Sequence, residues 1–245
     1  MVLVTDPLFF ASFGDDVAAG LRLTVSGEEA HHAAVKRVAP GERVLLANGE
    51  GLGVRAVVVD VGRRELEVEV VEVLRASSPP LVWGVAQALA KGDRSEIAVQ
   101  MATELGARRI LAWQASRSIV RWQGDRGDKA LEKWRATARE AVKQSRRLWT
   151  PEVLAASTAD VAEAIRDADV ALVLHEDADL HIAEVELAAA GTGLLVVGPE
   201  GGISPDELTR FAEAGALAVR ISDGVLRTST AAAVALGQLD VVARR

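Results

Sequence analysis

From residue 81 onward, short apolar runs alternate with amphipathic stretches, and this alternation constrains the fold more than any other feature. The apolar, strand-sized runs occupy residues 81–89, 109–114, 171–175, 194–197 and 216–221. Helical periodicity lies between or after them, at about 93–105, 128–148, 159–167, 180–190, 205–214 and 229–243. Strands that are apolar throughout are typical of sheets buried on both faces. The alternation therefore predicts an α/β domain with a parallel sheet.

Residues 1–76 have a different character and predict a small β-rich domain. Strand patterns cover residues 44–47, 53–61 and 65–73, the last alternating with period two as ELEVEVVEV. One short helix is expected within residues 27–38. The proline- and serine-containing segment ASSPP then predicts a boundary. We expect two domains, residues 1–76 and residues 77–245.

Composition excludes several classes of protein. The 245 residues are 49% hydrophobic and 26% charged, as in a folded globular protein. No apolar run reaches the roughly 18 residues of a membrane span, and the N-terminus lacks a secretory signal pattern. With no cysteine and only four histidines, two of them adjacent, we expect no disulfide and no metal centre. These features predict a cytoplasmic, metal-free protein without a membrane segment.

The charge is distributed unevenly along the chain. The formal net charge is −7, yet residues 77–150 carry 14 Lys and Arg against 7 Asp and Glu. All five tryptophans also lie in this basic segment, at Trp83, Trp113, Trp122, Trp134 and Trp149. Clustered cations with interleaved aromatic side chains favour nucleic-acid binding, through phosphate contacts and base stacking.

The helix predicted at 128–148 carries the clearest cationic row. Arg135, Arg139, Lys143 and Arg147 recur at i, i+4 and so share one helical face. A solvated surface helix, with Glu132 and Glu140 pairing locally, is the alternative. Between residues 129 and 147 there are seven bases and two acids, so local pairing leaves a cationic excess. We favour a polyanion-binding face.

The strongest local signal for a ligand site is LLVVGPEGGISPDEL. A buried strand runs into a loop with three glycines, and a helix then begins with a capping box formed by Ser204 and Glu207 around Pro205. Glycines let a ligand approach bare backbone. In open α/β sheets, ligands bind beyond the carboxyl ends of strands, where this loop is expected. It is neither a Walker loop nor a G-x-G-x-x-G motif.

A second signal is ISDGVLRTSTAAAVALGQL, in which Thr228 or Ser229 is expected to cap the final helix. Arg227 lies just before that helix N-terminus, where the helix dipole does not favour a cation. Two interpretations remain open. Arg227 either binds a carboxylate or phosphate of a ligand, or pairs with an acidic residue of the 151–245 segment.

Together these motifs resemble the RsmE family, SPOUT-superfamily methyltransferases that methylate uridine N3 in 16S ribosomal RNA. GPEGGISPDEL and VLRTSTAAAVAL resemble its C-terminal signature, QALAKGDRSEIAVQMATELGARRI its first helix region and EAVKQSRR its basic helix. HHAAVKRVAPGERVLLANGEG resembles its N-terminal PUA-like RNA-binding domain. The resemblance implies a PUA-like β-barrel over residues 1–76 and a SPOUT-type parallel sheet over 77–245, with a deep trefoil knot near 171–245. It also implies S-adenosylmethionine as cofactor, a homodimer, and 16S RNA within the 30S subunit as partner.

The resemblance also implies roles for particular residues. Arg227 is the expected catalytic residue, and Glu200 is either a proton acceptor or an anchor for its loop. The expected cofactor-binding residues are Leu174, His175, Glu176, Val197, Gly198, Pro199, Glu200, Gly201, Gly202, Ile221, Ser222, Gly224, Val225, Leu226 and Arg227. The expected RNA-binding residues are Lys36, Arg37, Arg135, Arg139, Lys143 and Arg147.

Three positions depart from the family pattern. Ser229 stands where the family more often has Glu, Ile203 replaces an aromatic residue, and Ser222 replaces a common glycine. The first departure puts any carboxylate role at position 229 in doubt.

Two alternative functions follow from the same motifs: a SPOUT enzyme acting on transfer RNA or 23S ribosomal RNA, and a non-catalytic RNA-binding protein of ribosome assembly.

Overall fold

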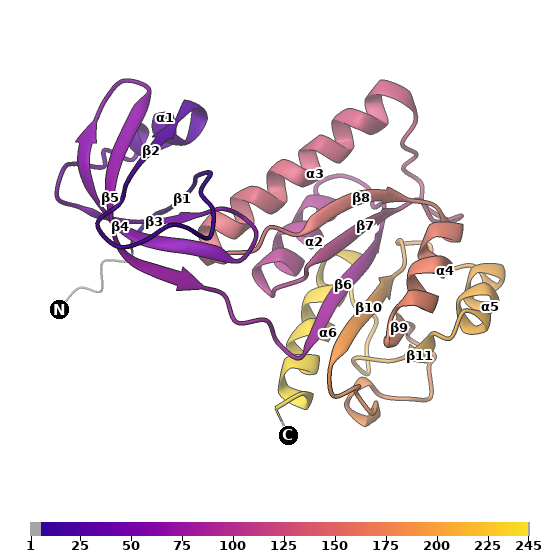
Figure 1. The fold of residues 1–245 in the computed structure, drawn as a ribbon. Helices are drawn as coiled ribbons and strands as arrows, with labels where there is room; N and C mark the ends of the chain where they lie inside the picture. Colours follow the sequence, from indigo (N-terminus) through magenta and orange to yellow (C-terminus); the bar gives the residue numbers. More distant parts are fainter. Residues whose placement is uncertain (1–5, 245) are drawn as a thin grey trace. The chain divides into compact units, whose positions relative to one another are not determined.

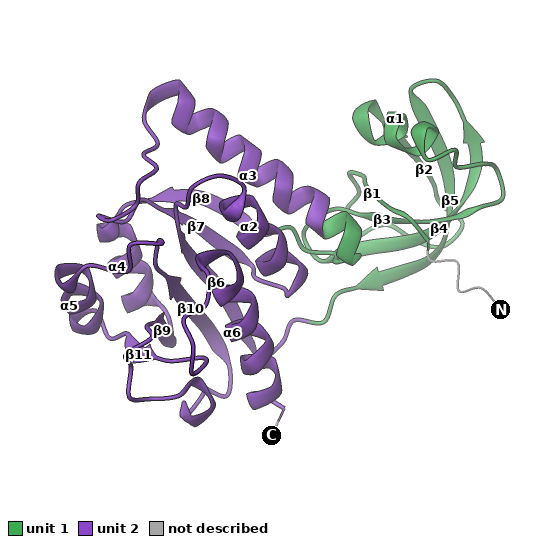
Figure 2. Ribbon diagram, turned by 180° about the vertical axis from the view of Figure 1, so that it is seen from behind, with its two compact units in different colours: residues 1–77, 142–150 green, residues 78–141, 151–245 purple. Residues whose placement is uncertain are grey.

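The computed structural model describes residues 6–244, and its internal contacts divide the chain into two compact units (Figure 2). The first unit contains the chain up to Ser77 together with Val142–Thr150, and the second contains Ser78–Ala141 and the chain from Pro151 onward. The sequence places residues 142–150 in the second domain. In the structure this segment belongs to the first unit, because Val142 is buried in one apolar cluster with Leu8 and Phe10.

The first unit is built on a five-stranded sheet with the order β1-β3-β4-β5-β2. Its elements are β1 (Leu8–Phe10), β2 (Arg22–Ser26), α1 (Gly27–Val35), β3 (Arg43–Ala47), β4 (Leu52–Val61) and β5 (Glu65–Arg75). β1 pairs with β3 in parallel, and the other pairs are antiparallel. On β5, Leu66, Val68 and Val70 are buried in the core of the unit, which confirms the predicted period-two alternation.

The second unit contains a six-stranded sheet with the order β11-β9-β10-β6-β7-β8, in which every strand pair is parallel. The strands are β6 (Leu81–Ala88), β7 (Arg109–Trp113), β8 (Glu152–Ala156), β9 (Val170–Leu174), β10 (Gly191–Val197) and β11 (Leu217–Val219). The helices are α2 (Arg94–Glu104), α3 (Gly124–Ser145, which belongs to the first unit from Val142 onward), α4 (Thr158–Asp167), α5 (Pro205–Glu213) and α6 (Thr228–Val242) (Figure 1). The predicted parallel α/β sheet is confirmed.

Both faces of this sheet are buried, as the apolar runs predict. Leu195 and Val197 of β10 join a cluster that includes residues of α2, α3 and α6. Leu194 and Val196 join the opposite cluster, which includes Phe211 of α5 and residues of α4. Successive residues of β10 therefore point to opposite faces, and helices cover each of them.

The helix expected at 180–190 does not form. Only Ile182–Glu184 makes a short 3-10 turn, η1. The backbone N–H of Ile182 donates to the carbonyl of Arg220, and the N–H of Arg220 donates to the carbonyl of Leu180. These bonds hold the chain extended beside the end of β11, so a tertiary contact overrides the local helical pattern.

In the described part of the chain, no helix is both long and apolar enough to cross a membrane.

Candidate functional site

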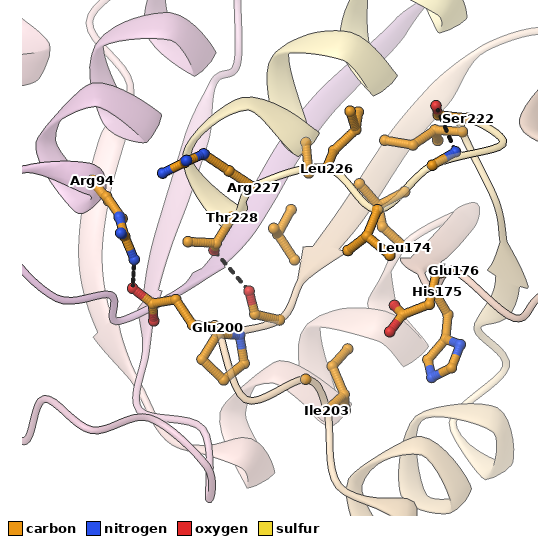
Figure 3. A pocket seen from close by; sticks show the side chains of 18 residues that line it. Arg94, Leu174, His175, Glu176, Glu200, Ile203, Ser222, Leu226, Arg227 and Thr228 are labelled. Carbon is orange, nitrogen blue, oxygen red and sulfur yellow. Dashed lines mark hydrogen bonds and ion pairs between the residues drawn. The ribbon is translucent and has the colours of Figure 1, made fainter.

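A pocket of about 300 Å³ lies at the carboxyl edge of the second unit's sheet (Figure 3). The loops that follow β9, β10 and β11 enclose it, because these strands are neighbours and parallel, so their carboxyl ends meet at one edge. Its lining comprises Arg94, Leu174, His175, Glu176, Val197, Gly198, Pro199, Glu200, Gly202, Ile203, Ile221, Ser222, Gly224, Val225, Leu226, Arg227, Thr228 and Ala231.

All of the expected cofactor-binding residues except Gly201 line this one pocket. Sequence reasoning missed four lining residues: Arg94, Ile203, Thr228 and Ala231. Ile203, Thr228 and Ala231 lie inside the two recognised motifs, GPEGGISPDEL and VLRTSTAAAVAL, which is the signal that could have found them. Arg94 begins α2 after a strand, a position typical of ligand contacts at this edge.

The glycine loop after β10 presents bare backbone to the pocket. The capping box at the start of α5 is confirmed, since the Ser204 hydroxyl accepts from the Glu207 N–H and the Glu207 carboxylate accepts from the Ser204 N–H. Gly202 has a φ of +72°, which other residues rarely adopt. A Cβ added to Gly202 would meet only Arg117 Nη1, at 3.9 Å, and one added to Gly224 would meet nothing within 4 Å. The backbone there therefore faces open space.

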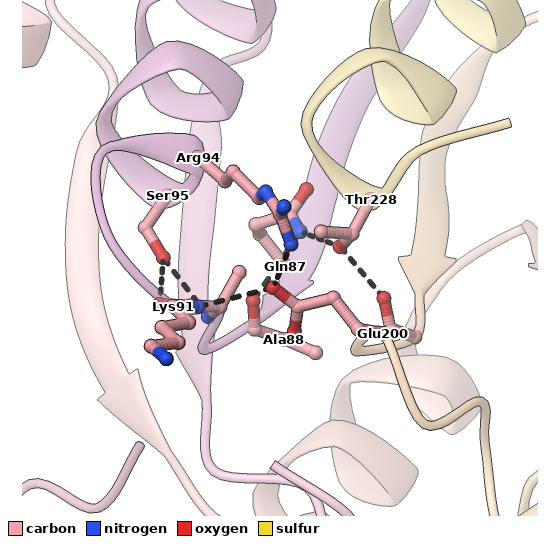
Figure 4. A network of polar contacts seen from close by, with 9 residues as sticks. Gln87, Ala88, Lys91, Arg94, Ser95, Glu200 and Thr228 are labelled. Carbon is pink, nitrogen blue, oxygen red and sulfur yellow. Dashed lines mark hydrogen bonds and ion pairs between the residues drawn. The ribbon is translucent and has the colours of Figure 1, made fainter. Parts of the chain in front are cut away.

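A chain of buried hydrogen bonds holds three segments of the pocket together (Figure 4). The side-chain amide of Gln87, at the end of β6, donates to Thr228 Oγ1 at 2.9 Å. The Thr228 hydroxyl in turn donates to the Gly198 carbonyl at 2.7 Å. Gln87 is 1% exposed and Thr228 is 7% exposed, so water does not compete for these bonds. They fix the start of α6 against the glycine loop.

Glu200 is held by an ion pair with Arg94 at the pocket rim (Figure 4). Its Oε1 accepts from Arg94 Nη1 at 2.9 Å and from the Lys91 backbone N–H at 3.1 Å. Burial alone would raise the pKa of Glu200. The hydrogen bonds from its own backbone amide, Lys91 and Arg94, with the charge of Arg94, nevertheless lower this pKa below its ordinary value. A carboxylate held in this way is a weak base, so the geometry favours the anchoring role over proton acceptance.

Arg227 is the N-cap residue of α6, with extended backbone and no side-chain cap hydrogen bond. The prediction that Thr228 or Ser229 caps the helix is therefore wrong, because the Thr228 hydroxyl is directed to Gly198 instead. The Arg227 side chain is exposed and lies on the same side of the pocket as Arg94 (Figure 3). Its guanidinium is placed to meet an anion or a polarised carbonyl of a ligand.

The predicted cationic row is not a continuous solvent-facing stripe of α3, because the helix ends at Ser145 and Arg147 lies beyond it. Lys143 is buried, with its side chain 7% exposed, and pairs with Glu29 Oε1 at 3.2 Å; it also lies 3.2 Å from His32 Nδ1. Lys143 was predicted to contact RNA, and this prediction is corrected because the side chain is buried in an ion pair. Arg135 donates to the Val153 carbonyl in β8 at 3.1 Å and pairs with Glu132. Two members of the row therefore contribute to packing.

The other predicted RNA contacts are more accessible. Arg139, Lys36 and Arg37 are exposed, and Arg147 is half-buried. Arg37 has a φ of +56°, which ends α1, and Lys36 Nζ lies 5.7 Å from the centre of the Phe9 ring.

Among residues 6–244, no three or more His, Asp or Glu side chains are arranged to hold a metal ion.

Comparison with known proteins decides the family. An RNA methyltransferase domain matches residues 77–240, and an RNA methyltransferase PUA domain matches residues 25–71. The ribosomal RNA small subunit methyltransferase E of Mycobacterium bovis is 47% identical over 92% of this chain and 88% of its own. The chain belongs to the ribosomal RNA small subunit methyltransferase E family.

Other members of the family agree with this assignment. The Bacillus subtilis enzyme of the same name is 30% identical over 88% of each chain. A Neisseria gonorrhoeae member, solved bound to S-adenosyl methionine, superposes with a TM-score of 0.85 at 26% identity, covering 97% of this chain and 98% of its own. A Legionella pneumophila methyltransferase solved with the same cofactor has a TM-score of 0.85 at 27% identity over 97% and 98% of the two chains.

Proposed function

We propose that this protein transfers a methyl group from S-adenosylmethionine to N3 of a uridine in the 16S RNA of the small ribosomal subunit. The observation that carries the proposal is the pocket itself. Three neighbouring loops of a parallel sheet bring bare backbone, apolar side chains and the exposed Arg227 together at one edge. Family membership supplies the reaction class, since the similar proteins are named as small-subunit ribosomal RNA methyltransferases.

The residues present fit S-adenosylmethionine. The open space over Gly202 and Gly224 admits a ligand against the backbone, and apolar side chains such as Leu174 and Leu226 suit an adenine ring. The residues expected to hold the cofactor all line the pocket except Gly201, whose carbonyl accepts from Arg117 Nη1. When bound, the cofactor supplies an electrophilic methyl group on a sulfonium.

Arg227 is the residue proposed to act on the substrate. Uridine N3 loses its proton as the methyl group arrives, and negative charge develops on the uracil carbonyl oxygens. A guanidinium beside those oxygens stabilises that charge, and it also orients the base. Glu200 is assigned the positioning role of holding its loop to Arg94 and the Lys91 N–H, while the N3 proton passes to water.

Three further properties belong to the proposal. The family resemblance supports a trefoil knot near residues 171–245, compatible with β10 lying between β9 and β6. Exposed apolar residues on α2 and α6, among them Ile97 and Val241, with Leu105 at the C-cap of α2, support a homodimer through these helices. The PUA-like unit, with Lys36 and Arg37, and Arg139 of α3 are proposed to bind the RNA backbone, within the 30S subunit and in the cytoplasm.

The Arg227→Ala variant tests the proposed chemistry. Removing one group that stabilises transition-state charge costs about 100-fold to 1,000-fold in kcat. We expect that loss with S-adenosylmethionine affinity nearly unchanged, since the proposed cofactor contacts are mostly backbone groups. The matched control is Arg210→Ala, which removes an exposed arginine on α5 outside the pocket lining. Normal turnover by Arg227→Ala would remove this residue from the mechanism.

A further inference from the structure

A second cationic element lies at the same edge of the sheet as the pocket. The segment Ser116–Arg121, here called the β7 loop, follows β7, whose carboxyl end is beside that of β6. Arg117 Nη1 donates to the carbonyl of Gly201 at 3.2 Å. This contact places the β7 loop directly against the glycine loop of the pocket. Neither the sequence motifs nor the proposed mechanism assigns it a role.

The β7 loop is held in one shape by several hydrogen bonds. The backbone N–H and hydroxyl of Ser116 donate to the two carboxylate oxygens of Glu207, each at 2.8 Å. Arg121 donates to the carbonyls of Ala115 and Ser116 at 3.0 and 2.7 Å. The Trp122 N–H, just after the loop, donates to Gln114 Oε1 at 2.8 Å. A surface loop fixed in this way loses little conformational entropy when it binds a partner.

The same loop exposes an unusual combination of side chains. Ile119 is 74% exposed at a point between two exposed arginines, Arg117 and Arg121. A guanidinium carries five N–H donors, and among the described residues Gly201 takes one of those of Arg117. Among the exposed large apolar side chains of the described residues, only Val225, which itself lines the pocket, is more exposed than Ile119.

We propose that the β7 loop binds the nucleotides next to the target uridine, with Arg117 contacting a phosphate and Ile119 packing against the face of an unstacked base. A cation and an apolar surface side by side match the two parts of a single-stranded nucleotide. The contact with Gly201 then places the bound strand at the rim of the pocket. This inference rests on the proposed function, because it takes ribosomal RNA as the substrate.

The test compares Arg117→Ala, Ile119→Ser and wild type on 30S subunits and 16S RNA that lack the modification. Three quantities are measured: the KM for the RNA substrate, its Kd over a salt series, and the Kd for S-adenosylmethionine. For Arg117→Ala we expect RNA affinity to fall roughly tenfold and the slope of log Kd against log salt to fall by about 1. For Ile119→Ser we expect weaker RNA binding with the salt slope unchanged. S-adenosylmethionine affinity should not change in either variant.

Arg210→Ala is the matched control, because it removes one exposed arginine from α5 without touching the β7 loop. Unchanged RNA affinity and salt slope in Arg117→Ala would overturn the inference. A weaker S-adenosylmethionine affinity with normal RNA binding would also overturn it, by showing that Arg117 only braces the glycine loop. If wild type itself transfers no methyl group, the proposed function fails, whereas the salt series still tests the β7 loop.

Discussion

Replacing Thr228 by valine should destabilise the second unit and loosen the pocket. Valine has nearly the same shape as threonine, so the change removes the hydroxyl without opening a cavity. Two buried groups then lose a partner: the Gly198 carbonyl, now 2.7 Å from the hydroxyl, and the Gln87 amide, now 2.9 Å from it. The Gln87 amide keeps a longer contact of 3.3 Å with the Ala88 carbonyl.

The magnitude follows from these contacts. A buried donor or acceptor left unsatisfied costs about 1–3 kcal/mol, and the Gln87 amide is only partly deprived, so we expect a loss of about 2–4 kcal/mol. For a chain of this size that corresponds to a fall in Tm of roughly 4–16 °C. S-adenosylmethionine affinity should fall as well, because Gly198 and Thr228 both line the pocket.

Scanning calorimetry and cofactor titration measure the two effects. Thr228→Ser is the matched control, because it keeps the hydroxyl and should stay close to wild type in both measurements. Gln87→Leu combined with Thr228→Val should cost less than the sum of the two single changes, because the coupled groups leave together. A Thr228→Val protein with wild-type Tm and wild-type cofactor affinity would refute the view that this hydroxyl joins the segments.

Three further changes test other parts of the structure. Burial would raise the pKa of Glu207, but hydrogen bonds from Ser116 and Ser204 lower this pKa below 4.5. The ionised carboxylate therefore stabilises the fold above that pH, and the stabilisation is lost as pH falls through the pKa of the folded state. The difference in unfolding free energy between wild type and Glu207→Gln, measured by urea unfolding, should shrink below about pH 4.5; a difference that grew there would contradict this reasoning. Gly193→Ala places a Cβ 2.4 Å from the Trp83 ring, and should lower the free energy of unfolding by roughly 1–3 kcal/mol in the same assay. Lys143→Met removes the ion pair of Lys143 with Glu29 and leaves the Glu29 carboxylate buried, which should lower the free energy of unfolding by about 3–5 kcal/mol. A Lys143→Met protein of wild-type stability with weakened RNA binding would instead show that Lys143 contacts RNA.

The local features of the site could be read from the sequence because neighbouring residues determine them. Ser204, Pro205 and Glu207 specify a helix start whatever surrounds them, and the glycines of the preceding loop indicate close backbone approach. The parallel sheet followed from apolar runs of strand length. These signals located the glycine loop and the edge of the sheet, whereas the set of lining residues came from the resemblance to the family.

The partners across the sheet could not be read in this way. Gln87 and Thr228 are 141 residues apart in sequence, and only the strand order brings them together. The same limit explains Lys143: helical periodicity groups the cations of α3 on one face, but it does not say which of them are buried against α1. The extended chain beside Arg220 replaced a predicted helix for a similar reason, since its hydrogen bonds come from another strand end.

Methyl transfer from labelled S-adenosylmethionine tests the central claim most directly. Unmodified 30S subunits and free 16S RNA are incubated with wild type and with Arg227→Ala, and the RNA is digested for nucleoside mass analysis. The account predicts 3-methyluridine with wild type and a loss of at least about 100-fold with Arg227→Ala. Label in a different nucleoside, or no label in either RNA despite measurable cofactor binding, would contradict it.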